Sequence, residues 1–263
     1  MNETIQLLLN RKSIRAYEER PISAEDRELL LQTTLRAPTA GNMMLYSIIE
    51  VNDQAAKDTL ARTCDNQPFI AKAPLVWLFL ADYQRWFDFF TLSGVEELCR
   101  RRGERWRKPQ EGDLFLACND ALIAAQTAVV AAESLGIGSC YIGDIMENYE
   151  AHRDLFGLPH YVFPICLLCF GYPTQGQMQR PMTPRYDRKF IVFPDRYRRL
   201  DQADFDEMYR DAQERFARNP DRPDGIANVG QAMYARKFAS DFSVEMTRSV
   251  RAILCNWETP RPQ

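Results

Sequence analysis

The sequence predicts a globular fold in which helices and buried strands share one core. The segment Ala121–Ala132 has Gln126 and Thr127 as its only polar side chains, and Gly136 soon after it is a typical helix stop. The run Pro74–Ala81 is continuously apolar, as expected for a strand that is buried on both faces. With 46% hydrophobic and 11% aromatic residues, the 263-residue chain can bury a sizeable core.

The Ala-rich segment is expected to be a core helix or a subunit-interface helix, because it has almost no face to show to water. A membrane span is the alternative. Asn119, Asp120, Gln126 and Glu133 count against a span, as does an uncharged run shorter than the roughly 18 residues that a span needs. The next stretch, Ile137–Asp144, reads as a short glycine-containing strand, which either lets a flat ligand approach the backbone or is an ordinary connection.

The N-terminal part combines a short apolar helix, Ile5–Leu9, with an unusually basic turn, Asn10–Tyr17. The cations and the hydroxyl of this turn are the groups that bind a phosphate monoester, although a solvated basic turn has the same composition. Ser23, with Asp26 three residues later, predicts the start of a helix that Pro38 ends.

The loop Ala37–Asn42 consists of small and hydrogen-bonding residues and precedes a predicted strand, Tyr46–Val51. It is either a plain turn or a bed for the edge of a planar ring. Ala55–Arg62 is predicted to be a surface helix. Aromatic and basic residues are interleaved over Tyr83–Gln110. A helical lid over a pocket is favoured there over a nucleic-acid surface, because the block is short and matches no RNA-binding signature.

The C-terminal half begins with a predicted helix, Glu147–Phe156, and a strand, Val162–Phe170, followed by a loop-like region at 174–199. Apolar stripes beyond Asp201 predict helices. Residues 201–263 are therefore expected to form a helical extension, which either belongs to the same domain as residues 1–200 or embraces a partner subunit.

Charge and cysteine content exclude several classes. The net charge of −3 gives no electrostatic reason to bind nucleic acid or an acidic membrane. Seven scattered cysteines and a short, polar N-terminus predict a reduced, cytoplasmic protein. Cys166 and Cys169 have C-x-x-C spacing but lie in a predicted strand, where they would face opposite ways, so we expect structural thiols. The two histidines, His152 and His160, show no zinc-ligand spacing, and no metal site is predicted.

Four blocks together resemble the FMN-dependent nitroreductase family in order and in spacing. They are Arg11–Arg15 with the following Pro21–Ser23, Ala37–Asn42, Leu135–Gly143 and Phe170–Pro173. Each block alone is weak evidence for the family, whereas the four blocks in this order and spacing are specific for it. The length and the helical tail are similar to those of the larger branch, which comprises oxygen-insensitive NADPH nitroreductases and flavin reductases.

The resemblance implies an α+β fold, in which a mixed, mostly antiparallel sheet is wrapped by helices, and an intertwined homodimer with FMN at the subunit interface. Residues 1–200 would be the FMN-binding domain. The central helix would pack against its counterpart in the other subunit, which would explain an apolar helix with no polar face.

The resemblance also implies which side chains bind FMN. Arg11 and Ser13 would hold the phosphate and the ribityl chain, with Lys12 beside them. Arg15 would lie near the pyrimidine edge of the flavin, and Arg180 matches a phosphate-binding cation.

The ring-binding residues follow in the same way. Thr39, Ala40 and Gly41 match a loop of the other subunit that touches the cofactor, and Gln67 matches a side chain at the ring edge. The backbone segment that would face the reactive side of the ring comprises Tyr141, Ile142, Gly143 and Asp144.

The implied activity is the NAD(P)H-dependent reduction of nitroaromatic, quinone or flavin-type acceptors in a ping-pong hydride-transfer cycle. The flavin would carry the chemistry, so no catalytic side chain is expected. Another flavin-dependent reduction, such as reductive dehalogenation, and a non-catalytic FMN-binding role are the alternatives. The physiological acceptor and the choice between NADH and NADPH stay open.

Three departures from the family pattern affect this expectation. Met43–Tyr46 replaces the Gln-Pro-Trp common in the small-residue loop. Met182 stands where the larger branch carries a second arginine for the phosphate. Either Arg185 takes over this role or the phosphate is held less tightly. Asp144 replaces a glycine and brings a negative charge close to a site that accepts hydride.

Overall fold

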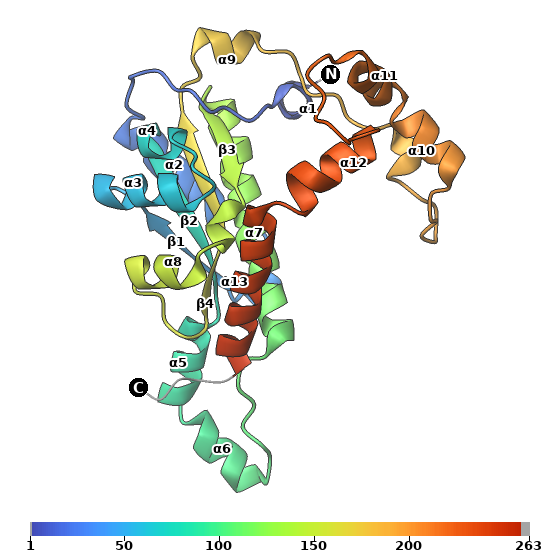
Figure 1. Ribbon diagram of the computed structural model, residues 1–263. Coiled ribbons are helices and arrows are strands. Elements are labelled where there is room, and N and C mark those ends of the chain that lie inside the picture. Colours follow the sequence, from blue (N-terminus) through green and yellow to red (C-terminus); the bar gives the residue numbers. More distant parts are fainter. Residues whose placement is uncertain (1, 259–263) are drawn as a thin grey trace. The chain divides into compact units, whose positions relative to one another are not determined.

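The computed structural model describes residues 2–258 and divides into two compact units (Figure 1). The first is built from the chain up to Arg180 and from Glu245 onward, and the second is Pro181–Val244. The second unit is thus inserted into the sequence of the first. The expected division of the chain after residue 200 stays a prediction.

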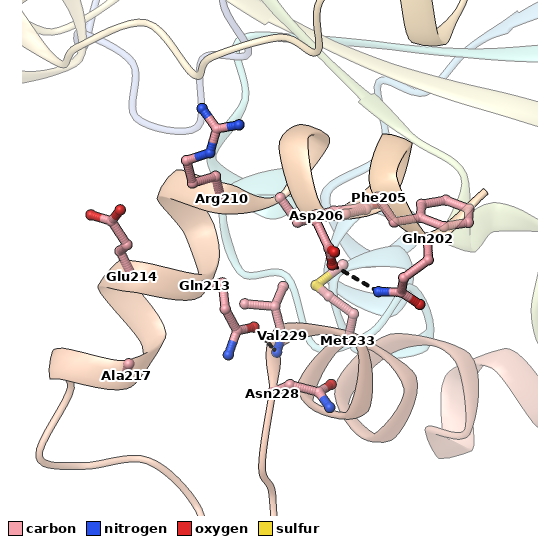
Figure 2. Close-up of a pocket in the computed structure, with 12 residues that line it drawn as sticks. Gln202, Phe205, Asp206, Arg210, Gln213, Glu214, Ala217, Asn228, Val229 and Met233 are labelled. Carbon is pink, nitrogen blue, oxygen red and sulfur yellow. Dashed lines mark hydrogen bonds between the residues drawn. The ribbon is translucent and has the colours of Figure 1, made fainter. Parts of the chain in front are cut away.

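The second unit is helical. Its elements are η3 (Arg188–Phe190), α10 (Gln202–Met208), α11 (Arg210–Arg218), α12 (Val229–Met233), the π-helical turn η4 (Tyr234–Phe238) and the start of α13 (Asp241–Glu258). Figure 2 shows a cavity of about 750 Å³ between α10, α11 and α12, with Phe205 and Met233 among its apolar walls. The Val229 backbone N–H donates to the side chain of Gln213 at 3.0 Å and ties α12 to α11.

The first unit is organised around a four-stranded sheet. Its strands are β1 (Tyr46–Glu50), β2 (Leu75–Asp82), β3 (Gly138–Ile142) and β4 (Val162–Gly171), in the order β1-β2-β4-β3. All three pairings are antiparallel, and an isolated parallel bridge joins Ser13 to Ser139 beside β3. With helices on both faces of the sheet, the predicted α+β fold is confirmed.

The helices of this unit are α1 (Glu3–Asn10), α2 (Ala24–Thr34), η1 (Ala40–Asn42), α3 (Gln54–Thr63), α4 (Phe69–Lys72), α5 (Gln84–Leu92), α6 (Val95–Arg102), α7 (Glu111–Ser134), η2 (Asp144–Met146), α8 (Tyr149–Phe156) and α9 (Gln175–Gln179), with α13 closing the chain. The predicted cap of α2 is confirmed, since Ser23 accepts a hydrogen bond from the backbone N–H of Asp26. Gly136 ends α7 as expected, with a φ of +72° that favours glycine.

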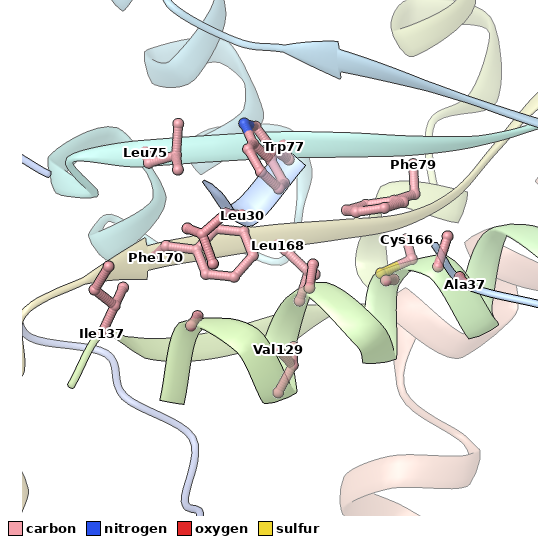
Figure 3. Packing of buried hydrophobic residues seen from close by; sticks show 14 of the residues in the cluster. Leu30, Ala37, Leu75, Trp77, Phe79, Val129, Ile137, Cys166, Leu168 and Phe170 are labelled. Carbon is pink, nitrogen blue, oxygen red and sulfur yellow. The ribbon is translucent and has the colours of Figure 1, made fainter. Parts of the chain in front are cut away.

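One face of the sheet packs on α7 and α2. Trp77, Phe79 and Phe170 point from β2 and β4 toward alanines and Val129 of α7, with Leu30 of α2 at the same core (Figure 3). Trp77 and Phe170 meet edge to face with centroids 5.4 Å apart. Because the alanines of α7 are small, the helix lies close to the large aromatic side chains of the strands.

The opposite face of the sheet packs on α3 and α4. Val76, Leu78 and Leu80 of β2 alternate with the residues of the first face and meet Leu60 and Ile70. The prediction of a strand buried on both faces is therefore confirmed: every residue of β2 is buried.

The C-x-x-C cysteines lie on opposite faces, as predicted. Cys166 belongs to the core on the α7 side, and Cys169 to the core on the α3 side. Both are free thiols, and burial raises the pKa of each. These properties agree with structural cysteines.

α7 is buried along one face only within the single chain. Its exposed side carries large apolar residues at helical spacing, and this α7 stripe consists of Phe115, Leu116, Leu122 and Ile123. Among the described residues, α7 is also the one helix long and apolar enough to cross a membrane, a property that core helices share. Of the two predicted alternatives, burial of α7 entirely within its own chain is not found, and a helix at a subunit interface stays a prediction. The sequence does not separate core contacts from contacts with another chain.

The basic N-terminal segment is held across the end of the sheet by main-chain contacts. The backbone N–H of Ile14 donates to the Ser139 carbonyl at 2.9 Å, and that of Glu18 donates to the Tyr172 carbonyl at 2.8 Å. This close approach needs glycine at two paired positions, Gly138 and Gly171. A Cβ on Gly138 would meet Ile14 Cγ1 at 2.5 Å, and a Cβ on Gly171 would meet Tyr17 Cδ1 at 2.6 Å.

We expect Gly138→Ala to lower the free energy of unfolding by about 1–3 kcal/mol, because the added methyl overlaps the Ile14 side chain. Gly112→Ala is the matched control, since a Cβ there meets nothing within 4 Å. Urea unfolding of the two variants and the wild type measures the difference. Equal stability of the two variants would contradict the tight contact.

Candidate functional site

Three predicted cofactor-binding side chains of the basic segment gather around one buried thiol. Arg11, Ser13 and Arg15 all lie close enough to Cys140 of β3 to act on its thiol. Burial raises the pKa of the Cys140 thiol, whereas these three residues lower it. The structure therefore brings Arg11, Ser13 and Arg15 together beside the start of β3.

α9 and the residue that follows it close the same cluster from the other side. Arg180 Nη2 donates to the Ser13 carbonyl at 2.7 Å. Lys12 Nζ donates to the carbonyls of Met178 and Arg180, each at 2.7 Å. The Arg15 backbone N–H donates to the side chain of Gln177 at 3.2 Å. Lys12 thus ties the two segments together, and Arg180 lies directly beside Ser13.

Arg11 has a donor that the protein leaves unused. Its Nη1 is buried and finds no hydrogen-bond partner, and the buried Oγ of Ser139 also lacks one. The nearest acidic group is Glu133 of α7, whose pKa burial raises to about 7 while Arg11 lowers it. Because Glu133 is largely neutral below that pH, it does not fully balance the guanidinium. A buried, unsatisfied cation of this kind is a site for an anion.

The residues predicted to lie at the ring form a second group beyond the other end of β3. Gln67 Nε2 donates to Asp144 Oδ2 at 2.8 Å and to the Cys64 carbonyl at 3.0 Å. Gly143 is exposed and has no side chain, so the backbone is bare there. Tyr141 O–H donates to the side chain of Gln126 on α7 at 3.2 Å, while Ile142 is buried in the core on the α3 side.

The two groups are separated by the length of one short strand. Ser139, beside the cations, and Asp144 are five residues apart, which corresponds to roughly 15 Å of extended chain. An elongated ligand with an anionic group at one end and a flat ring at the other matches this arrangement of cations and bare backbone.

The loop with Thr39, Ala40 and Gly41 is fixed to α7 instead. Asp120, which is buried, accepts hydrogen bonds from Thr39 Oγ1, from the Ala40 N–H at 3.0 Å and from the Leu45 N–H at 3.1 Å. Gly41 has a φ of +55°. Within residues 2–258, the hydrogen bonds of Thr39 and Ala40 go to Asp120 and to their own loop, and none goes to the basic segment.

The aromatic and basic stretch at 83–110 is partly packed. Trp86 Nε1 donates to the Met43 carbonyl at 2.7 Å, and Trp106 stacks on Phe87 with centroids 5.5 Å apart. Arg85 donates to the Met44 and Tyr46 carbonyls. These hydrogen bonds fix Met43–Tyr46, the segment that follows the Ala37–Asn42 loop and that departs from the family pattern.

Several residues of the site were not among those predicted. Ser139, Glu133 and Gln177 each contact or face the basic segment, and Glu147 lies next to Asp144. Ser139 is the only one with a local signal, since it lies inside the glycine-containing strand. Met182 and Arg185 belong to the second unit. No group of three or more potential metal ligands occurs in the described part of the chain.

Comparison with known proteins gives one consistent family. The model described as "Nitroreductase family" matches residues 8–172. The FMN reductase (NADPH) of Bacillus subtilis strain 168 is 32% identical over 187 residues, which cover 70% of this chain and 72% of that protein. The oxygen-insensitive NADPH nitroreductase of Salmonella typhimurium is 30% identical over 213 residues, 79% and 81% of the two chains. Nitroreductase A from Vibrio parahaemolyticus, a crystal structure, has a TM-score of 0.78 at 25% identity and covers 97% of this chain and 98% of its own.

The raised pKa of Glu133 predicts a pH-dependent stability. A glutamate in the unfolded chain has a pKa of about 4.3, so between that pH and about 7 the folded state keeps a proton that the unfolded state has lost. Stability therefore falls as the pH rises through this window. Glu133→Gln removes the effect, and its free energy of unfolding relative to wild type should increase from pH 4 to pH 8 in urea titrations.

Glu150→Gln provides the opposite control. A hydrogen bond from Arg248 holds the pKa of Glu150 below its ordinary value, so this variant should lose stability relative to wild type as the carboxylate of the wild type ionises. Parallel pH profiles of the two variants would refute the assignment for Glu133.

Proposed function

Because the chain belongs to the nitroreductase family, we propose that it is an FMN-dependent oxidoreductase that uses NAD(P)H to reduce nitroaromatic, quinone or flavin-type acceptors. The observation that carries the proposal is the buried, unused Nη1 donor of the half-buried Arg11, beside Ser13 and Arg180 and one strand length from the bare backbone at Gly143.

The cation cluster fits the phosphate of FMN. Arg11 has a free N–H, Arg180 is held beside Ser13, and Lys12 uses two of its three donors on carbonyls. A dianionic phosphate satisfies the buried donor of Arg11 and gains charge-assisted hydrogen bonds there. In this assignment Arg11, Ser13 and Arg180 bind the phosphate end, and Lys12 fixes the loop that carries Arg180.

The residues at the far end of β3 fit the ring. When bound, FMN supplies the hydride chemistry of a ping-pong cycle, and the protein supplies placement and charge. Gly143 lets a planar group approach the main chain, and the backbone N–H of Gly143 or Asp144 is available to orient it. Gln67, fixed by Asp144, lies at the ring edge. Arg15 belongs to the basic segment and acts on Cys140 inside β3, between the two groups, and we assign it to the pyrimidine side of the ring, where it offsets negative charge.

A homodimer completes this site. Thr39, Ala40 and Gly41 are held on α7, away from the basic segment of their own chain, and we assign them to the cofactor bound mainly by the partner subunit. The α7 stripe is the surface on which the two chains meet, because an exposed apolar stripe on a long helix is stabilised by burial against a second helix. We place the protein in the cytoplasm, in keeping with its free thiols.

A visible absorption spectrum tests the cofactor and the donor together. The purified protein should show the bands of bound oxidised flavin, and NADPH or NADH under anaerobic conditions should bleach them. Arg11→Met should weaken FMN binding roughly 10- to 150-fold, the equivalent of the ~1.5–3 kcal/mol of a hydrogen bond to a charged group. Arg62→Met, which removes an exposed cation on α3, is the matched control.

Protein that stays colourless after incubation with FMN would exclude the proposal. Bound flavin that neither nicotinamide bleaches would instead favour the non-catalytic role. Nitroaromatic, quinone, free flavin and halophenol acceptors, compared on one preparation, identify the class of reduction.

The α7 stripe predicts the oligomeric state. Ile123→Glu should convert a dimer into monomers in analytical ultracentrifugation, because it places a charge at the centre of the proposed contact. Leu92→Glu is the control, since Leu92 is an exposed leucine on α5, outside the stripe. A dimer that survives Ile123→Glu would mean that the stripe is not the interface.

A further inference from the structure

Two acidic residues meet at the turn that follows β3. Asp144 is the first residue of η2 and Glu147 directly follows its last, and the Glu147 N–H donates to the Asp144 carbonyl at 3.0 Å. The Asp144 carboxylate is close enough to raise the pKa of Glu147. Glu147 is deeply buried, at 4% exposure, and its Oε1 finds no hydrogen-bond partner.

A carboxylate oxygen that is buried without a hydrogen-bond donor is costly, so burial without a donor favours the neutral form of the carboxyl group. The buried partner is the one that keeps the proton, since burial penalises its charged form. Burial and the neighbouring Asp144 raise the pKa of Glu147 to about 8. At neutral pH the pair then has one negative charge.

The groups packed around Glu147 add negative charge. Asp65, on the loop after α3, and Glu245 of α13 both raise its pKa. Glu245 is itself ionised, because hydrogen bonds from Arg248 and Ser249 lower its pKa to about 2.

The neutral neighbours do not supply a balancing charge. The imidazole of His152 lies between Thr63 Oγ1 and the Ile145 carbonyl, and burial lowers its pKa. The Cys64 thiol is buried, and burial, Asp144 and Glu147 raise its pKa further. The charged groups that act most strongly on Glu147 are therefore carboxylates.

Hydrogen bonds of Asn148 fix the turn after η2, and this keeps the Glu147 side chain buried. Asn148 has a φ of +48°, and its side chain donates to the Thr63 carbonyl at 2.8 Å. Its backbone N–H donates to Glu245 at 3.1 Å. Asp144, in contrast, is half-buried and accepts a hydrogen bond from Gln67 next to the exposed Gly143. Of the two carboxyl groups, Asp144 is therefore the one that lies next to the exposed part of the site.

We propose that Glu147 keeps its proton beside Asp144, and that Glu147 is a positioning residue that limits the negative charge beside the bound flavin to one. This inference rests on the proposed function and deepens it. Loss of the proton to solvent leaves two carboxylates there. Since a reduced flavin carries negative charge, the second carboxylate disfavours reduction, and the midpoint potential of the bound flavin falls.

The first test uses the full chain without flavin, with carboxyl carbons labelled for NMR. The Glu147 signal, identified by its loss in Glu147→Gln, should titrate with a midpoint near pH 8. In Asp144→Asn the midpoint should move to lower pH, because the repulsive charge is gone. A wild-type midpoint below neutral pH overturns the proposal, as does a midpoint that Asp144→Asn leaves in place.

The second test follows the midpoint potential of the bound flavin against pH. In the wild type the potential should fall more steeply around pH 8, where one extra proton is taken up with two electrons. Glu147→Gln keeps a donor toward Asp144 but has no proton to lose, so the steep segment should disappear while the potential at low pH is retained. A steep segment that persists in Glu147→Gln overturns the proposal.

Glu133→Gln is the matched control, because Glu133 is another buried carboxyl with a raised pKa. This variant should keep the steep segment, and loss of the segment here would assign it to Glu133 instead. A protein that binds no flavin would defeat the proposed function, whereas the NMR titration would still decide whether the carboxyl pair holds a proton.

Discussion

The site depends on two glycines that face each other on neighbouring strands. Gly138 and Gly171 are paired in the sheet, and the N-terminal segment lies over both of them, with Ile14 against the first and Tyr17 against the second. Main-chain hydrogen bonds then fix the segment on the sheet. The basic segment is therefore placed by backbone contacts, and the Nη1 donor of Arg11 is left without a partner in the protein.

The resulting site has opposite charge at its two ends. Arg11, Arg15 and Arg180 gather at the start of β3, and Asp144 and Glu147 lie just beyond its end. A ligand with a phosphate at one end matches the first group by charge. Two carboxyl groups are unusual next to a centre that accepts hydride. A proton kept on Glu147 reduces the negative charge of the pair to one.

The sequence predicts those features that depend on local pattern. The continuous apolar run gave β2, and the strand period placed Cys166 and Cys169 on opposite faces before their surroundings were known. The same reasoning failed for α7, because Phe115 and Ile123 are as apolar as core residues although they are exposed in the single chain. Hydrophobicity does not tell which chain supplies the contact.

Within the site, local motifs identified the basic turn and the glycine-containing strand, whereas the family resemblance supplied Gln67 and Arg180. Glu133 and Glu147 were missed because their properties come from burial and from neighbours distant in the sequence. A carboxylate on a helix is usually solvated, and nothing in the local sequence marks these two as exceptions. The raised pKa of each is a consequence of the tertiary structure.

The second unit has a topological consequence. Pro181–Val244 leaves the first unit after α9 and returns to it in α13, so that the sheet and its two layers of helices are complete without it. Insertions between such points change in length and composition without disturbing the scaffold. Changes of length or composition within Pro181–Val244 are accordingly expected to leave the sheet of the first unit intact.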